Sequence, residues 1–317
     1  MRKGPLIPLG VFMLAIGMVL TACSTGDTEK SNPTIAMPPN PVVIPAGFAN
    51  PELLVDTAWL DQHLDDDAVR VLDTRTSSSY EEGHVPGAVN VTTGQYTATV
   101  DGVPGMVTPQ QEFAKVMENA GVSNDTHVVI VDAGNMLTAS RLLWTLEYYG
   151  HQNVSILYGG QAAWLADGRD VNREEPVVGT TSFTVTPASS LVADLPEMLQ
   201  RLDDPGLIVL DSRSPEEYAG ENVRTQRGGH IPGAVNVDWT LHLVPGEVPT
   251  LKPPSELREL YEAAGFTRDK EVISYCQTGF RAAHGYLVLR LLGYDNRKVY
   301  DGSWVEWGNR EDTPIEK

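Results

Sequence analysis

The chain has 317 residues and a formal net charge of -19 at pH 7, because 42 acidic side chains outnumber 23 lysine and arginine side chains. An acidic excess of this size argues against nucleic acid or an anionic lipid surface as a partner, since like charges repel. It also means that an anionic substrate needs a local positive site in order to bind.

The chain begins with a stretch that is typical of export. A basic start precedes an apolar run over residues 6–20, and the segment Leu-Thr-Ala-Cys at 20–23 resembles the lipobox of bacterial lipoproteins. That resemblance implies a signal peptide over residues 1–22, cleavage before Cys23 and acylation of its thiol; an uncleaved N-terminal anchor is the alternative. Either way we expect the protein in the cell envelope, facing the extracytoplasmic side. If Cys23 is acylated, its lipid would hold the protein at a membrane.

Residues 23–50 are rich in proline, serine, threonine and asparagine. Such a segment buries too little apolar surface to fold, so we predict an extended tether. The remaining chain, about 265 residues, suits two domains of ordinary size better than one.

The remaining chain repeats itself at a spacing of about 140 residues. In each half, short apolar strands alternate with helical segments, which predicts an α/β fold: two tandem domains, each a mainly parallel sheet with helices on both faces. We expect the domains over residues 51–172 and 190–317, with a linker over 173–189. The matching segments, in chain order, are 69–75 with 207–213, 83–91 with 229–237, 128–132 with 272–276, 149–154 with 292–297, and 160–164 with 303–307.

A loop in the second half contains the residues best suited to chemistry. The pattern predicts a buried strand over residues 272–275 and a helix over 282–292, which Gly293 ends. The loop from Cys276 to Arg281 therefore opens onto a helix N-terminus, where backbone N–H groups lack partners and the dipole is positive. A thiol held there, five residues before an arginine, should react as the thiolate.

Cysteine usage supports the same loop. The chain has two cysteines, so Cys276 stands alone if Cys23 is acylated. Exported proteins usually pair their cysteines. A lone thiol in such a protein favours retention for reactivity over retention for packing.

Three motifs in register make the chain resemble the two-domain rhodaneses, the family of thiosulfate and 3-mercaptopyruvate sulfurtransferases. They are the paired Gly-His-x-Pro-Gly-Ala segments that start at Gly83 and Gly229, the loop that starts at Cys276, and the Tyr-Asp-Gly-Ser-Trp segment that starts at Tyr300. In this family only the second domain has the nucleophile. Here Asp132 takes the place of the cysteine in the first repeat, so the resemblance implies a catalytically silent, structural first domain.

The resemblance implies covalent sulfur transfer without a cofactor. The Cys276 thiolate would attack the outer sulfur of thiosulfate, or of another small anionic donor, and the persulfide would pass its sulfur to a thiophilic acceptor such as cyanide or a small thiol. The loop amides would form an anion nest around the sulfur, and the arginine would pair with the donor's oxygen atoms. The candidate substrate-binding residues are Gln277, Thr278, Gly279, Phe280, Arg281, Arg213 and Arg227.

Two other functions stay open. Some dual-specificity phosphatases share the fold but have a longer loop than the four residues between Cys276 and Arg281. The shorter loop makes a smaller cradle, which suits a single sulfur atom better than a phosphate. The other alternative is a non-catalytic sulfur carrier or binding module, against which the intact Cys276, Gly279 and Arg281 favour an enzyme.

The loop favours thiosulfate as the donor, with 3-mercaptopyruvate as the alternative. Mercaptopyruvate enzymes of the family typically have a small uncharged loop, whereas Arg281 makes this loop positive. The animal thiosulfate enzymes differ from this chain in having two basic residues after the cysteine, and a distal arginine where Glu217 stands here. Arg224 or Arg227 could supply the missing positive charge.

The remaining candidates fit structural roles better than chemical ones. We expect turn or packing roles for His84 and His230, an ion pair between Asp211 and Arg213 rather than a substrate contact, core positions for Trp304 and Trp307, and a surface position for His284. The sequence shows no metal-ligand spacing and no glycine-rich phosphate loop.

Overall fold

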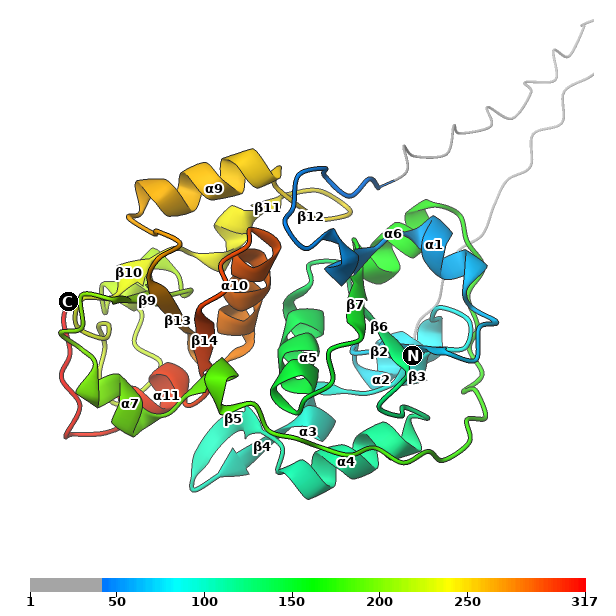
Figure 1. Ribbon diagram of the computed structural model, residues 1–317, viewed down its shortest axis with the longest axis horizontal. Helices are drawn as coiled ribbons and strands as arrows, with labels where there is room; N and C mark the ends of the chain where they lie inside the picture. The colour runs from blue at the N-terminus through cyan, green and yellow to red at the C-terminus, as the bar shows by residue number, and fades with distance from the viewer. Residues whose placement is uncertain (1–41) are drawn as a thin grey trace, which may run out of the picture. The chain divides into compact units, whose positions relative to one another are not determined.

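The structure is a computed structural model that describes residues 42–317 (Figure 1). The predicted signal peptide, the predicted lipidation site Cys23 and most of the predicted tether lie outside the described residues. Residues 42–317 belong to one compact unit, which contains two five-stranded sheets. None of the helices described in this range is long and apolar enough to cross a membrane.

The first sheet has the strand order β1-β7-β6-β2-β3, and all neighbouring strands are parallel. Parallel neighbours require crossover connections, which the helices of this half provide. An antiparallel hairpin, β4 with β5, extends the connection before α4. The elements of this half are η1 (Pro51–Leu53), β1 (Leu54–Val55), α1 (Thr57–Gln62), β2 (Val69–Asp73), α2 (Ser77–Glu82), β3 (Val89–Asn90), α3 (Thr93–Tyr96), β4 (Thr97–Val100), β5 (Val103–Val107), α4 (Gln110–Asn119), β6 (His127–Val131), α5 (Leu137–Tyr148), β7 (Val154–Leu157) and α6 (Gly160–Ala166).

The second sheet repeats this topology. Its order is β10-β9-β13-β14-β8, again with all neighbours parallel. When equivalent strands are matched, this is the order of the first sheet read from its other edge. The predicted fold class is therefore confirmed. The elements of this half are η2 (Ser189–Leu191), β8 (Val192–Ala193), α7 (Leu195–Gln200), β9 (Leu207–Asp211), α8 (Pro215–Tyr218), β10 (Val235–Asn236), η3 (Trp239–His242), β11 (Leu243–Val244), β12 (Thr250–Leu251), α9 (Pro254–Ala263), β13 (Glu271–Tyr275), α10 (Phe280–Leu291), β14 (Arg297–Tyr300) and α11 (Ser303–Trp307).

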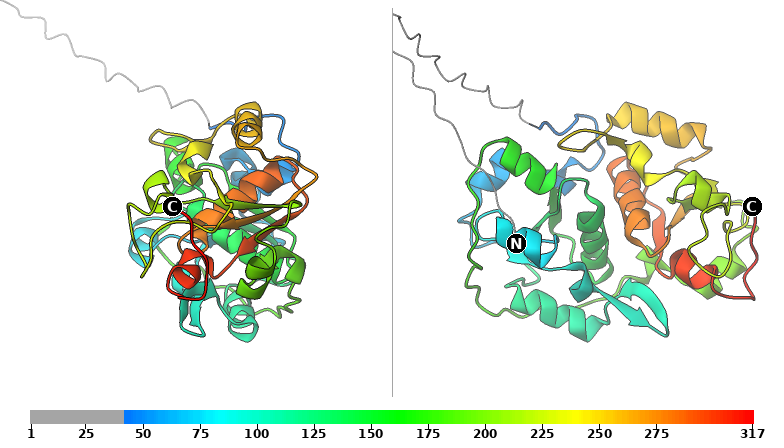
Figure 2. Two further views of the ribbon diagram at one scale, coloured as in Figure 1. Left: turned by 90° about the vertical axis from the view of Figure 1, so that its left-hand side faces the viewer. Right: turned by 180° about the vertical axis from the view of Figure 1, so that it is seen from behind.

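The two halves meet through equivalent helices, α5 and α10, which lie side by side in Figure 1 and in the rear view of Figure 2. Each has nine buried residues, because each is covered by its own sheet on one side and by the other helix on the opposite side. The largest hydrophobic cluster contains residues of both helices, and two smaller clusters cover the outer faces of the sheets.

The described end of the predicted tether and the predicted linker both pack on the domains. The tether prediction is wrong for residues 42–50: Phe48 is buried, and Ala49 N donates a hydrogen bond of 2.7 Å to the carbonyl of Leu291 in α10. Apolar side chains between the prolines give this segment surface to bury. The linker residue Phe183 is likewise buried, and Thr186 N bonds to the carbonyl of Tyr149 over 2.9 Å.

Candidate active site

Cys276 follows β13, the central strand of the second sheet, and precedes α10. It lies at the carboxyl end of a parallel strand, where open α/β sheets bind ligands. Its backbone N–H donates to Ser303 Oγ over 3.3 Å, and Trp304 N donates to its carbonyl over 2.8 Å. The start of α11 thus fixes the loop. The cysteine is only 1% exposed.

The predicted turn at Gly279 is the N-cap of α10. Its φ of +85° lies in the left-handed region that favours glycine, and its carbonyl accepts the first helical bond, from Ala283 N, over 2.9 Å. The helix that follows has 12 residues, long enough for a substantial dipole. Its free amide hydrogens and positive end therefore face the loop that holds the cysteine.

Arg281 is held by a carboxylate. Its Nη1 and Nη2 donate to Glu217 Oε2 and Oε1 over 2.5 and 2.9 Å. Burial lowers the pKa of Arg281, but Glu217 and the neighbouring sulfur raise it by more. Burial alone would raise the pKa of Glu217, yet Arg281 outweighs it and holds that pKa at about 2. The loop arginine is therefore charged, next to the thiol, and balanced by Glu217.

Glu217 is the functional residue that sequence reasoning misjudged. It was noted only as the replacement for a distal arginine, whereas the structure makes it the partner of Arg281. Its carboxylate also accepts the Ser214 backbone N–H over 3.2 Å in a capping box at the start of α8, which fixes its direction. The Ser-Pro-Glu-Glu segment was the available signal for that cap.

Of the other basic candidates, Arg224 contacts the carboxylate that holds Arg281, and Arg227 does not. Arg224 Nη1 contacts Glu217 Oε1 at 3.3 Å and is half exposed, so it belongs to the same charge cluster. The prediction that Arg227 binds substrate is wrong for this structure, because its guanidinium donates to the carbonyls of Thr313 and Trp307 at the C-terminal segment.

Arg213 is a buried structural cation and not a substrate ligand. It forms the expected ion pair with Asp211, with Nη2 at 2.6 Å from Oδ2, and donates to the carbonyl of Gly229 over 2.8 Å. Its guanidinium lies 4.4 Å from the ring centroid of Trp304. Arg75 and Asp73 repeat the pair in the first half, as the duplicated motif predicted.

The first domain covers the remaining loop residues. Thr278 lies against Gly105 of β5: a Cβ added to Gly105 would lie 3.0 Å from the Cβ of Thr278. Phe280 packs on the large hydrophobic cluster, and Gln277 is buried with its Oε1 unpartnered among the described residues. Of the three predicted positions, Gln277 is thus buried, whereas Thr278 and Phe280 are partly exposed.

The histidines and tryptophans follow the structural expectations with one exception. His84 and His230 each bond to a tyrosine carbonyl and stack on that tyrosine's ring, and Trp304 and Trp307 are buried. The surface prediction for His284 is wrong, because α10 is buried on both sides. Its Nδ1 lies 3.3 Å from Nδ1 of His242, and burial lowers its pKa to about 4. Within residues 42–317, no group of three or more possible metal ligands occurs.

The equivalent loop in the first domain contains its own anion. Asp132 is fully buried, and its Oδ1 accepts the Gly134 backbone N–H over 2.8 Å. Burial raises the pKa of Asp132 to about 6, although backbone N–H groups of Gly134, Met136 and Ala139 lower it. Met136 caps α5 with a φ of +60°, as Gly279 caps α10, and the residue two positions later is Thr138 instead of an arginine. The carboxylate therefore occupies the cradle without any nucleophile or cation.

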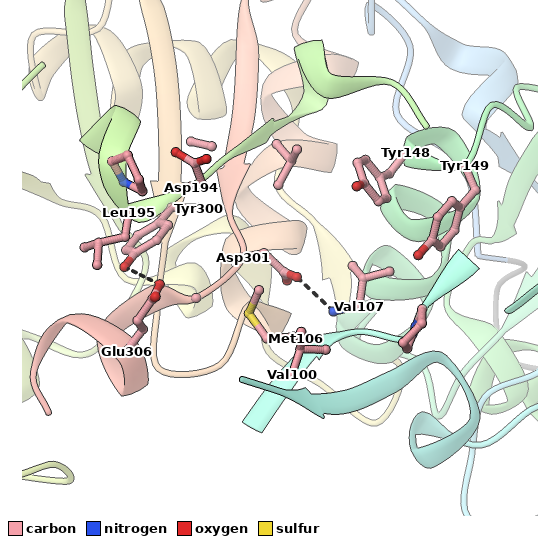
Figure 3. A pocket seen from close by; sticks show the side chains of 15 residues that line it. Val100, Met106, Val107, Tyr148, Tyr149, Asp194, Leu195, Tyr300, Asp301 and Glu306 are labelled. Atoms are coloured by element: carbon pink, nitrogen blue, oxygen red, sulfur yellow. Dashed lines mark hydrogen bonds between the residues drawn. The ribbon is translucent and has the colours of Figure 1, made fainter. Parts of the chain in front are cut away.

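A cavity of about 440 Å³ lies where the halves meet, behind the Asp301–Ser303 turn that fixes Cys276. Figure 3 shows side chains of both halves facing it, with Tyr148 from the first half and Tyr300 from the second. Asp301 crosses the junction: its Oδ2 accepts the Val107 backbone N–H over 2.8 Å.

The comparisons with known proteins agree with this geometry. A model of the rhodanese-like domain matches residues 56–167 and 194–310, which are the two halves. The chain belongs to the rhodanese family. This rhodanese is 35% identical over 269 residues to a thiosulfate sulfurtransferase of Azotobacter vinelandii, a match that covers 85% of this chain and 98% of that protein. It is 37% identical over 285 residues to the sulfur carrier protein TtuD of Thermus thermophilus, covering 86% and 99%.

Among solved structures, the rhodanese is similar to SseA of Escherichia coli, described as a 3-mercaptopyruvate sulfotransferase. The TM-score is 0.73 at 30% sequence identity, and the match covers 80% of this chain and 98% of that one. A persulfide form of EanB, with ergothioneine, gives a TM-score of 0.78 at 23% identity and shares the fold.

Proposed function

We propose that this rhodanese is a thiosulfate sulfurtransferase that works through a persulfide on Cys276. One observation carries the proposal: the thiol ends the central strand beside the charged Arg281 and in front of the α10 N-terminus. This combination favours an anionic sulfur at that position. Relatives that carry the name thiosulfate sulfurtransferase, at 34–35% identity over most of the chain, support it.

The transfer proceeds as two displacements. The Cys276 thiolate attacks the outer sulfur of thiosulfate; the new S–S bond forms as the bond to the sulfonate sulfur breaks, and sulfite leaves with that electron pair. The resulting persulfide is anionic and remains at the positive helix end. Cyanide then attacks its outer sulfur, so thiocyanate leaves and the thiolate is restored; a thiolate acceptor would leave as a persulfide.

Donor binding requires Arg281 to exchange partners. Its fork pairs with both oxygens of Glu217, and a sulfonate has oxygen atoms suited to the same bidentate contact. Arg224, which contacts the same Glu217 oxygen as Arg281 Nη2, can keep that carboxylate paired as the donor enters. The charge cluster thus provides the local positive site that an acidic protein needs for an anionic substrate.

3-Mercaptopyruvate is the second candidate donor, and the resemblance to SseA favours it. Its carboxylate would use the same arginine, with pyruvate as the leaving group. A carrier role, which the printed name of the Thermus relative suggests, would use the same persulfide with a protein acceptor.

The deciding experiment treats the full chain carrying Cys23→Ser, in which Cys276 is the only thiol, with thiosulfate and then measures peptide masses. We expect the peptide with Cys276 to gain one sulfur and to lose it on addition of cyanide, with release of thiocyanate. Cys276→Ser should show neither step. Parallel assays with 3-mercaptopyruvate rank the donors by kcat/KM. Absence of the added sulfur with both donors would refute the sulfurtransferase.

We also propose that lipid on Cys23 anchors this domain pair at the outer face of a membrane of the cell envelope. The support is the sequence at 6–23 alone. Expression in a bacterial host with a labelled fatty acid should label the chain and place it in the membrane fraction. Cys23→Ser should abolish both, and label retained by that variant would refute the assignment.

A further inference from the structure

The catalytically silent domain carries a buried arginine that reaches the catalytic loop. Arg141 lies on α5, is fully buried, and packs against the backbone of Gly279. A Cβ at Gly279 would lie 2.4 Å from Arg141 Nη1, so only glycine leaves room for this guanidinium. Gly279 therefore has two roles: it is the N-cap of α10, and it leaves room for the Arg141 side chain from the other domain.

The contacts of Arg141 link three parts of the molecule. Its Nη2 donates to the carbonyl of Gly105 over 2.9 Å and to Asp301 Oδ1 over 2.6 Å. Asp301 belongs to the turn whose Ser303 fixes the Cys276 backbone. The guanidinium thus contacts the loop, its supporting turn and the β5 strand together.

The rest of the guanidinium lies over the ring of Trp144, 4.8 Å from its centroid, with Nη1 next to Gly279 of the loop. Its Nε and Nη1 make no hydrogen bond to any described residue, although both are buried. The ring centroid of Phe280, the first residue of α10, lies 5.7 Å from its central carbon. A buried cation with free donors is costly unless its surroundings need it, and within residues 42–317 its one ion pair is with Asp301.

We propose that Arg141 is a positioning residue for sulfur transfer: it holds the loop at Gly279 and neutralises Asp301, so that the cradle behind Cys276 keeps its shape and positive character. The silent domain thereby contributes to the active site of its duplicate. This inference rests on the proposed sulfurtransferase function. It also predicts that Arg141 affects the rate of persulfide formation more than donor binding, since the donor's oxygen atoms are assigned to Arg281.

The test compares Arg141→Met, Arg141→Lys and a matched control, Arg290→Met, in the Cys23→Ser chain. Arg290 on α10 forms an ion pair with the buried Glu147 of α5, so its loss removes a junction ion pair that does not involve the loop. We expect Arg141→Met to lower the single-turnover rate at saturating thiosulfate by ~10–100-fold, with half-saturation changed less than ~2-fold. Arg141→Lys should recover part of that rate, and Arg290→Met should stay close to the parent.

Alkylation of Cys276 by iodoacetamide provides a readout that needs no sulfur donor. Arg141→Met should slow it by ~10-fold or more, and Asp301→Asn in the same chain should restore part of the loss by removing the unbalanced carboxylate. Parental rates in Arg141→Met would overturn the proposal, as would equal losses in Arg290→Met. If Arg141→Met fails to fold, the lysine variant decides: a parental transfer rate there, despite one donor group in place of a fork, also overturns it. If the parent takes up no sulfur, the proposed function fails, while alkylation still tests the role of Arg141.

Discussion

The Glu217–Arg281 pair gives the sharpest prediction. Glu217→Gln keeps the size of the side chain and an oxygen that can accept the Ser214 N–H, but it removes the charge that balances Arg281. The native pKa of Glu217 is about 2, against an ordinary 4.5. A shift of that size corresponds to roughly 3 kcal/mol, which solvent screening at this partly accessible cluster reduces to about 2 kcal/mol.

The sign of the pH dependence follows from the direction of that shift. The native pKa of Glu217 is lowered, so its contribution to stability is complete above pH 4.5 and is lost as the pH falls towards 2. Glu217→Gln should therefore unfold about 2 kcal/mol more easily at pH 7. The difference from the parent should shrink progressively below pH 4.5. Urea unfolding at several pH values measures both.

The same substitution should improve donor binding. With Glu217 neutral, the fork of Arg281 is free for the sulfonate, so half-saturation with thiosulfate should fall by roughly 3–10-fold, equivalent to about 1 kcal/mol. Glu271→Gln is the matched control, because Glu271 pairs with Arg201 at the opposite end of β13. It should lose stability without any change in half-saturation. An unchanged or higher half-saturation in Glu217→Gln would refute the exchange of partners at Arg281.

Three further substitutions test the two loops. Arg281→Ala should raise half-saturation with thiosulfate by ~10-fold or more; unchanged kinetics would make this arginine a bystander. Asp132→Asn should stabilise the protein by about 3 kcal/mol above pH 6. The pKa of Asp132 is raised to about 6, so the cost of ionising it accumulates between pH 3.8 and 6; equal unfolding curves at pH 8 would contradict this. Asp132→Cys should give no second persulfide, since Thr138 stands where an arginine is needed; mass analysis of Cys276→Ser/Asp132→Cys after thiosulfate would detect one.

The parts of this structure that the sequence predicted are those encoded locally. The strand before Cys276, the helix after it and the glycine turn depend on residues next to one another. Because the halves are duplicates, each strand and helix predicted in one half could be compared with its equivalent in the other. Arg141 was missed because its contacts lie far away in sequence. The one available signal was a single cation in the middle of helix α5, next to the apolar run Leu142–Trp144, which indicates a buried partner but does not identify it.

The errors have the same origin. His284 was placed at the surface because a polar residue on a helix usually lies there, but α10 is covered on both sides. Arg227 was assigned to substrate from its closeness in sequence to a family motif, whereas its partners are in the last residues of the chain. The tether prediction for residues 42–50 followed from the proline-rich composition of residues 23–50 as a whole, and it overlooked the few apolar side chains near Pro45. In each case packing of distant segments decided the outcome.

The burial of α10 on opposite sides has a consequence for the history of the duplication. Its face towards α5 includes Tyr286, whose hydroxyl donates to Glu147 of α5, and this surface would be left in water if the first half were deleted. Even where the loop of the first half has no nucleophile, its helix α5 has a structural role, because α10 depends on it to cover an apolar surface. Shortening this enzyme to its second half would therefore require redesigning a whole helix face.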